Sequence, residues 1–65
     1  MKAIYIYFVS GDFWSLPCSS EEEFKFVKST IILAGRTGQI QRIGNYNGDE
    51  AWINFANVTY WEVVS

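Results

Sequence analysis

The fold of this chain is decided by residues 51–64, which read AWINFANVTYWEVV. This stretch holds two tryptophans, a phenylalanine, a tyrosine and four β-branched aliphatic residues. Around the link Ala56-Asn57, the pattern predicts two strands, residues 51–55 and 58–64. None of these side chains is a usual catalytic group, and a chain of 65 residues cannot easily bury so many aromatic rings in its own core. We therefore interpret the stretch as packing surface, part of it for contact with another molecule.

The second of these strands has two unlike faces. Trp61 and Val63 share one face, whereas Tyr60, Glu62 and Val64 share the other. Because a buried carboxylate is costly, we expect Trp61 and Val63 to face the core. Tyr60 and Val64 then lie on a mixed surface that suits a contact between subunits.

The N-terminal part of the chain predicts a hairpin. Residues 2–9 alternate between two side-chain sets that are both apolar or aromatic, which indicates a central strand. We expect Tyr5 and Tyr7 to be covered by the helix, by a second layer or by another subunit. Ser10-Gly11-Asp12 predicts a turn, residues 13–16 a returning strand, and Pro17 its end, because proline has no backbone donor. The run 4–9 lacks a small-residue cleavage site and is too short to span a membrane. We therefore expect a cytoplasmic protein with no membrane contact.

A short helix of two to three turns follows. Ser20 is a good N-cap, and Glu23, three positions later, completes a capping box. The run of three glutamates stabilises the positive end of the helix dipole, and we prefer this reading to a metal or catalytic cluster. Phe24 and Val27 form the inward face. Phe26 falls about 200° from Phe24 around the helix, so we expect a side contact or exposure.

After this helix the sequence predicts a strand and a tight turn. Residues 30–34 form a continuous apolar run rich in β-branched side chains, which is typical of a strand buried on both faces. Residues 35–38 have a glycine at each end and predict a turn that presents Arg36 to solvent.

Residues 39–46 predict another strand, in which Ile40 and Ile43 are an odd number apart and so indicate a bulge or an irregular edge. Asn47-Gly48 is a strong hairpin signal. We therefore predict a single α+β domain over residues 1–65: a small, mainly antiparallel sheet or partial barrel of five or six strands with one short helix, in the order ββαββββ.

The composition favours self-association. Histidine is absent and Cys18 is the single cysteine, which excludes an intrachain disulfide and a structural zinc site within one chain. A domain of this size is usually stabilised by disulfides, by a metal ion or by oligomerisation, so we expect a homodimer or a larger assembly. We interpret Cys18 as a small, partly buried side chain; the alternative is a modestly reactive thiol whose pKa is lowered by the following helix.

No enzyme chemistry is indicated by the residues. Acid–base catalysis most often uses histidine, and the glycine-rich segment near Arg36 lacks the lysine and helix start of a phosphate-binding loop. We therefore expect no catalytic residue, no cofactor and no metal. The net charge of −2 argues against general affinity for nucleic acid, although residues 24–46 carry four cations and no acid.

The remaining class is binding. We expect a small, homo-oligomeric protein that binds and inhibits or regulates another protein, as phage or mobile-element proteins do. One alternative is a module that holds a nucleotide-like anion between subunits, with Arg36 and Arg42 on the phosphates; another is a binder of single-stranded nucleic acid. Aromatic side chains and arginine are enriched at interface hot spots, so the candidate contact residues are Trp14, Phe26, Arg36, Arg42, Tyr46, Trp52, Tyr60 and Val64.

Overall fold

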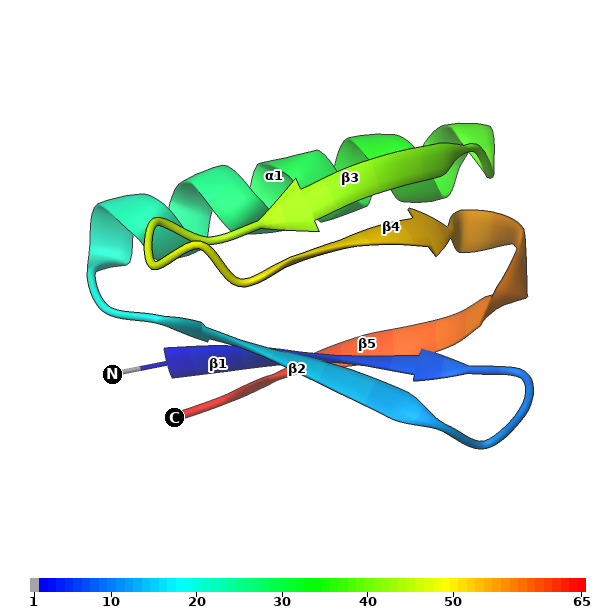
Figure 1. The fold of residues 1–65 in the computed structure, drawn as a ribbon, viewed down its shortest axis with the longest axis horizontal. Helices are drawn as coiled ribbons and strands as arrows, with labels where there is room; N and C mark the ends of the chain where they lie inside the picture. The colour runs from blue at the N-terminus through cyan, green and yellow to red at the C-terminus, as the bar shows by residue number, and fades with distance from the viewer. Residues whose placement is uncertain (1) are drawn as a thin grey trace.

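The computed structural model describes residues 2–65, which form one helix and five strands in two antiparallel sheets (Figure 1). The predicted α+β class with a mainly antiparallel arrangement is confirmed. The elements are β1 (Lys2–Phe8), β2 (Phe13–Cys18), α1 (Glu21–Thr37), β3 (Ile40–Gly44), β4 (Glu50–Asn54), the short 3-10 helix η1 (Phe55–Asn57) and β5 (Val58–Val64).

The larger sheet has the order β2-β1-β5, so the N-terminal strand is central, as predicted. Ile6 of β1 lies opposite Trp14 of β2 and Trp61 of β5. The register between β1 and β5 shifts after Tyr7. This irregularity lets Val58 and Trp61, which are an odd number apart, both pack against the core.

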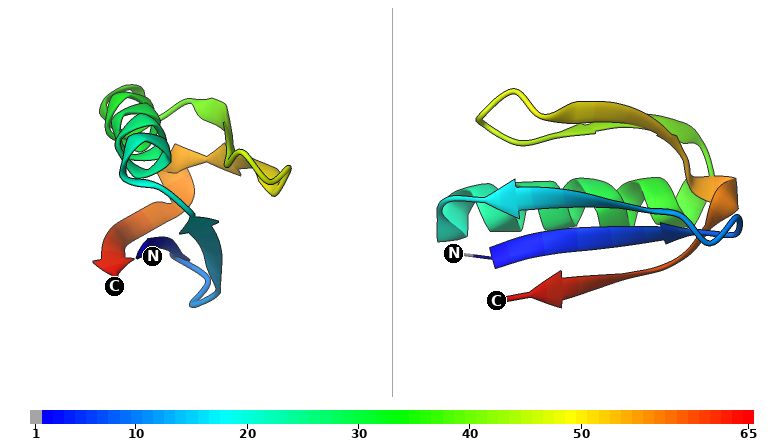
Figure 2. Two further views of the ribbon diagram at one scale, coloured as in Figure 1. Left: turned by 90° about the vertical axis from the view of Figure 1, so that its left-hand side faces the viewer. Right: turned by 60° about the horizontal axis from the view of Figure 1, so that its bottom comes forward.

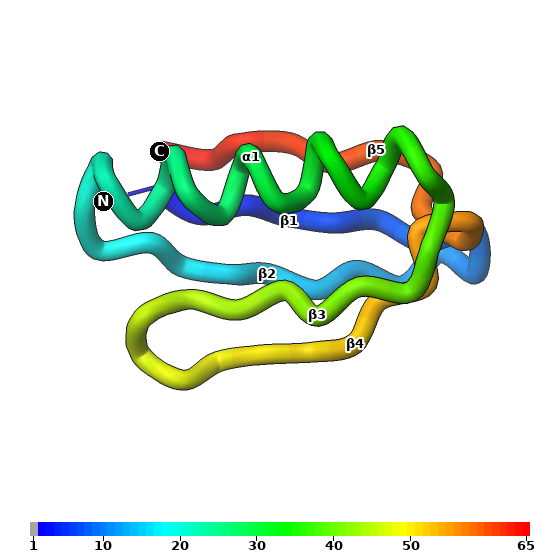
Figure 3. The backbone as a smooth tube through the Cα atoms, turned by 90° about the horizontal axis from the view of Figure 1, so that it is seen from above, coloured from blue at the N-terminus to red at the C-terminus, as the bar shows by residue number. Residues whose placement is uncertain are grey.

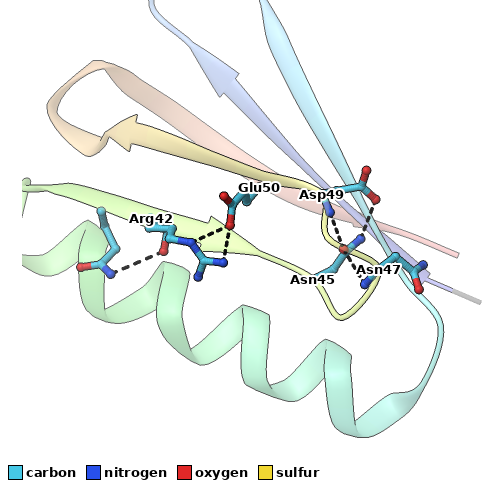
Figure 4. A network of polar contacts seen from close by, with 6 residues as sticks. Arg42, Asn45, Asn47, Asp49 and Glu50 are labelled. Carbon is cyan, nitrogen blue, oxygen red and sulfur yellow. Dashed lines mark hydrogen bonds and ion pairs between the residues drawn. The ribbon is translucent and has the colours of Figure 1, made fainter.

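The smaller sheet is the hairpin β3–β4, which turns at Asn45–Asp49. The side-chain oxygen of Asn45 accepts hydrogen bonds from the backbone N–H groups of Asn47 and Asp49, at 3.0 and 3.1 Å (Figure 4). The register is continuous along the hairpin, so the bulge or irregular edge predicted for residues 39–46 is wrong. Ile43 is buried and Ile40 is exposed, because residues an odd number apart in a regular strand face opposite sides.

The helix is longer than predicted. It runs through residues 30–34, so the strand predicted there is wrong, and the predicted turn at 35–38 is the last helical turn followed by its cap. Gly38 has a φ of 65° and donates its N–H to the carbonyl of Ala34, as a C-terminal capping glycine does. The helical pattern outweighs the strand preference of the β-branched run because it buries one stripe, made by Phe24, Val27, Ile31 and Ala34.

The core lies where the helix, the inner face of the larger sheet and the hairpin meet. The helix runs along the strands of the larger sheet (Figure 3), and the hairpin flanks it (Figure 2). Each of the three parts contributes buried apolar residues. They are Ile4, Ile6, Leu16 and Cys18 from the sheet, the four stripe residues of α1, and Ile43, Ile53 and Phe55 from the hairpin and η1.

Candidate binding surface

The face of the larger sheet opposite the helix is left uncovered by every element of residues 2–65 (Figure 2). The strand registers place three side chains from each strand on it. We call it the aromatic face. Only one of its members is charged, which is unusual for the solvent side of a sheet. Its residues are Ala3, Tyr5, Tyr7, Phe13, Ser15, Pro17, Tyr60, Glu62 and Val64.

Four aromatic rings form a contiguous row across this face. The rings of Tyr5 and Phe13 stack with their centroids 5.5 Å apart, and those of Tyr7 and Tyr60 stack at 4.4 Å. Tyr7 also meets Phe13 at 5.8 Å, which links the two pairs. Phe13 and Tyr60 remain 56% and 55% exposed. The row therefore holds its shape through its own contacts while leaving much of its surface free for another molecule.

The single charge on the aromatic face is engaged. The hydroxyl of Tyr7 donates a hydrogen bond of 2.7 Å to the Glu62 carboxylate. This bond, with desolvation and the negative charge of Glu62, raises the pKa of Tyr7 to about 12. The Glu62 carboxylate is thus tied to the row by a hydrogen bond, and the aromatic face carries no other charged side chain.

The Tyr7–Glu62 pair predicts a distinctive titration. The absorbance change of Tyr7 on ionisation should occur near pH 12, and Glu62→Gln should return it toward pH 10. Because the folded-state pKa is raised, the stability this pair contributes is complete below pH 10 and is lost as the pH rises toward 12. Titration of Tyr7 near pH 10 in the wild-type protein would contradict the pairing.

A second exposed group lies on the outer side of the hairpin. Trp52 of β4 is 71% exposed and lies opposite Arg42 of β3. Arg42 forms an ion pair with Glu50 and donates a hydrogen bond of 2.7 Å from Nε to the same carboxylate (Figure 4). The guanidinium therefore already has an anionic partner within the hairpin.

The predicted contact residues fall into separate groups. Tyr60 and Val64 were predicted to lie on the surface, and both lie on the aromatic face. Trp61 was predicted to face the core, and it packs against the core. Trp52 and Arg42 pair across the hairpin, and Phe26 of α1 meets Tyr46 of the turn at 6.2 Å.

Two predicted contact residues lie apart from these groups. Arg36 is in the last turn of α1 instead of at a turn tip. Trp14 points inward and packs partly buried against the core, so it takes no part in either exposed group. The row itself also contains Tyr5, Tyr7 and Phe13, which were missing from the predicted contacts. Both side-chain sets of residues 2–9 are apolar or aromatic, and this pattern could have identified Tyr5 and Tyr7 as contact residues.

Cys18 is buried beneath the larger sheet and points to the carbonyl of Leu16, with its sulfur 3.8 Å from that oxygen. Burial and the nearby charge of Glu23 raise the pKa of the thiol. The alternative of a pKa lowered by the helix start is therefore wrong, and the preferred structural role of a small core residue is supported, with more complete burial than predicted. A raised pKa makes the thiol a poor nucleophile at neutral pH.

Glu23 links the start of α1 to the turn of the β3–β4 hairpin through hydrogen bonds. As the capping box predicts, its N–H donates to the Ser20 hydroxyl. Its carboxylate accepts from the backbone N–H of Ser19, one residue before the N-cap, at 2.5 Å. Its other oxygen accepts from the backbone N–H of Tyr46, also at 2.5 Å. These bonds lower the pKa of Glu23 although the side chain has no exposed surface. The carboxylate therefore fixes the turn that carries Tyr46 to the start of α1.

Comparisons with known proteins find no matching family model, no similar curated protein and no similar solved structure. Among residues 2–65, no three histidine, cysteine, aspartate or glutamate side chains lie close enough together to hold a metal ion. The helix in this part of the chain is too short and too polar to cross a membrane.

Proposed function

We propose that this chain is a small, non-enzymatic, homo-oligomeric domain that binds another protein and inhibits or regulates it, and that the aromatic face is the surface in contact with that partner. The observation that carries this proposal is the row of four aromatic rings on an uncovered sheet face. Tyrosine supplies a large contact area with few rotatable bonds, so ordering it at an interface costs little entropy.

The composition of the aromatic face supports a protein partner. It carries neither lysine nor arginine, and its one carboxylate already accepts a hydrogen bond from Tyr7. Interface cores are depleted of charge and enriched in aromatic side chains. A partner with an apolar, weakly charged surface fits these properties, whereas a phosphate-bearing ligand does not.

The alternative of an anion or nucleic-acid site has less support. Its two arginines lie on different elements, one in the last turn of α1 and the other on β3. Arg42 is paired with Glu50, so a phosphate would have to displace an existing carboxylate. Lys2 lies over the ring of Phe24 and pairs with Glu21. This cation, too, already has partners within the chain and is less available to bind a phosphate.

Phe13→Glu is expected to abolish capture of the partner. It places a charge within the row of aromatic rings, where an unpaired charge buried in an apolar contact costs about 3–5 kcal/mol. Affinity capture from the native host, with bound proteins quantified by mass spectrometry, should give a specific set with the wild-type protein that Phe13→Glu reduces about 100-fold or more.

Two matched variants locate the site. Leu33→Glu puts the same charge on the exposed side of α1 and should leave capture unchanged. Trp52→Glu tests the exposed side of the hairpin. If Trp52→Glu removes the partner and Phe13→Glu does not, the contact lies on the hairpin and the assignment to the aromatic face is wrong.

A further inference from the structure

We propose that two copies of this chain associate through the free edges of their β5 strands, which pair antiparallel about Trp61 and place the two α1 helices side by side. The product is a continuous six-stranded sheet with both helices on one side. This deepens the self-association part of the proposed function, and it is independent of what the aromatic face binds.

The two edges of the larger sheet differ. At the β2 edge, the hairpin turn is docked, because Asn45 donates a hydrogen bond of 2.7 Å to the carbonyl of Pro17. At the β5 edge, no strand of residues 2–65 pairs with the outward backbone groups. β5 contains no lysine or proline, two of the usual means of protecting an edge. Its one charged residue, Glu62, is hydrogen-bonded to Tyr7 on the aromatic face, and its register irregularity is confined to the start of the strand. Its seven residues span about 23 Å, most of the 28 Å length of the molecule.

The core side of this edge is incompletely covered. Val63, although on the inner face of the sheet, is 40% exposed. Ile32, on the flank of α1, is also 40% exposed. Between helix and strand lies a groove of about 320 Å³, lined by Ile31, Gly35, Phe55 and Val58–Trp61. A strand that paired with β5 would therefore also lie beside uncovered apolar surface of the helix.

Gly35 points to an approach from outside the chain. A glycine within a helix is destabilising relative to alanine. Apart from the adjoining backbone of its own helix, a Cβ at Gly35 would meet no atom of this chain within 4 Å, so the packing of the single chain does not require the glycine. Gly35 and Ile32 are three positions apart and share one flank of α1. The bare backbone at Gly35 allows a second helix to come close at that flank.

A second copy is the occupant that matches all of these features. An isolated extended peptide would pair with β5 and leave Ile32 exposed. A second copy brings a strand and a helix in the same relative positions, so a two-fold axis beside β5 covers the strand edge, Val63 and Ile32 together. A two-fold interface of this kind is self-complementary by construction.

The side chains of β5 select the register. In an antiparallel pair, residues that lie opposite each other must point to the same face. In a two-fold pair of β5 strands, one residue therefore lies directly opposite its own copy, and the axis passes midway between these two copies. An axis at Glu62 would put two carboxylates directly opposite each other, which is destabilising. An axis at Tyr60 would use the irregular start of the strand, where the register with β1 shifts. An axis at Val63 would pair only residues 62–64 within the strand. An axis at Trp61, the middle residue, avoids these problems, pairs the whole of β5 and places Tyr60 opposite Glu62 of the partner subunit.

The helix flank provides the first test. Sedimentation of the wild-type protein at micromolar concentration should give twice the 7.5 kDa mass of one chain. Gly35→Glu buries a charge between the helices and should weaken association about 100-fold or more. Its fold should persist, as judged by circular dichroism, since a side chain there meets open space. Ile32→Glu should behave in the same way.

Leu33→Glu is the matched control, because Leu33 faces the groove between α1 and β3 on the other side of the helix, and it should remain dimeric. A wild-type monomer, or a dimer that Gly35→Glu and Ile32→Glu leave intact, would overturn the proposal. Phe13→Glu should stay dimeric while losing the partner, so the two proposals fail separately.

Cross-linking tests the register. In a Cys18→Ala background, Tyr60→Cys and Glu62→Cys variants are mixed and oxidised. Directly opposed strand residues lie about 4.5–5.5 Å apart between Cα atoms, within the range of a disulfide, whereas diagonal neighbours lie beyond it. Disulfides between the two variants should dominate in mass spectra. A majority of Tyr60→Cys or Glu62→Cys homodimers would place the axis elsewhere and overturn the register.

Discussion

Glu23→Ala is expected to lower the Tm by roughly 10–20 °C. The buried carboxylate accepts hydrogen bonds from the backbone N–H groups of Ser19 and Tyr46, and alanine removes the partner of both of these partly buried donors. It also releases the hairpin turn from the start of α1. Thermal unfolding followed by circular dichroism measures the loss.

Two neighbouring substitutions show whether this effect belongs to the buried carboxylate. Glu22 is exposed in the same helical turn, and Glu22→Ala should change the Tm by no more than a few degrees. Ser20→Ala removes the N-cap hydroxyl alone and should cost about 1 kcal/mol. If Glu23→Ala is as mild as Glu22→Ala, the contact with Tyr46 contributes little.

Glu23→Ala should also make the Tm depend less on pH under acidic conditions. The pKa of Glu23 in the folded protein is lowered from an ordinary value of about 4.3. A lowered pKa means that the stabilisation is complete above the ordinary value and is lost as the pH falls through the folded-state pKa. The difference in Tm between wild type and Glu23→Ala should therefore narrow below about pH 4.

Ile6→Ala is expected to remove most of the stability of the domain. Ile6 has no exposed surface and lies on the central strand between Trp14 and Trp61. Truncating such a residue costs about 2–5 kcal/mol, against a total of about 3–10 kcal/mol for a domain of this length. Urea unfolding should show a much lower midpoint, or an unfolded protein in buffer.

A smaller substitution at Ile6 and a matched substitution at an exposed isoleucine test whether the loss of stability comes from lost core packing. Ile6→Val removes one methylene and should cost about 0.5–1.5 kcal/mol. Ile40→Ala removes the same groups as Ile6→Ala from an exposed position and should stay within about 0.5 kcal/mol of wild type. Equal losses at the two positions would contradict the burial of Ile6.

Local chemistry explains which parts of the fold were predictable. The helix start was correct because the Ser20–Glu23 capping box involves residues three positions apart. The helix end was missed because the β-branched residues 30–32 favour a strand when considered alone. Burial of Ile31 and Ala34 in line with Phe24 and Val27 decides otherwise, and that burial depends on the sheet beneath the helix. Gly38 after Arg36 was the available C-cap signal.

The candidate surface was predictable only strand by strand. The cost of burying Glu62 was enough to place Tyr60 outside and Trp61 inside. The row of rings, however, depends on which residues of distant strands lie opposite each other. Tyr7 and Tyr60 stack because the β1–β5 register aligns them, and no short-range pattern specifies a pairing between the first and last strands.

That pairing also governs when the surface comes into existence during folding. Tyr7 and Glu62 are 55 positions apart, whereas Arg42 and Glu50 in the hairpin are 8 apart. Closing the longer loop costs more chain entropy, and contacts between distant positions form slowly. The helix and the hairpin are built from hydrogen bonds between nearby positions, whereas β5 pairs with β1, the first strand of the chain. We therefore expect the row of aromatic rings and the edge of β5 to be completed together and late in folding.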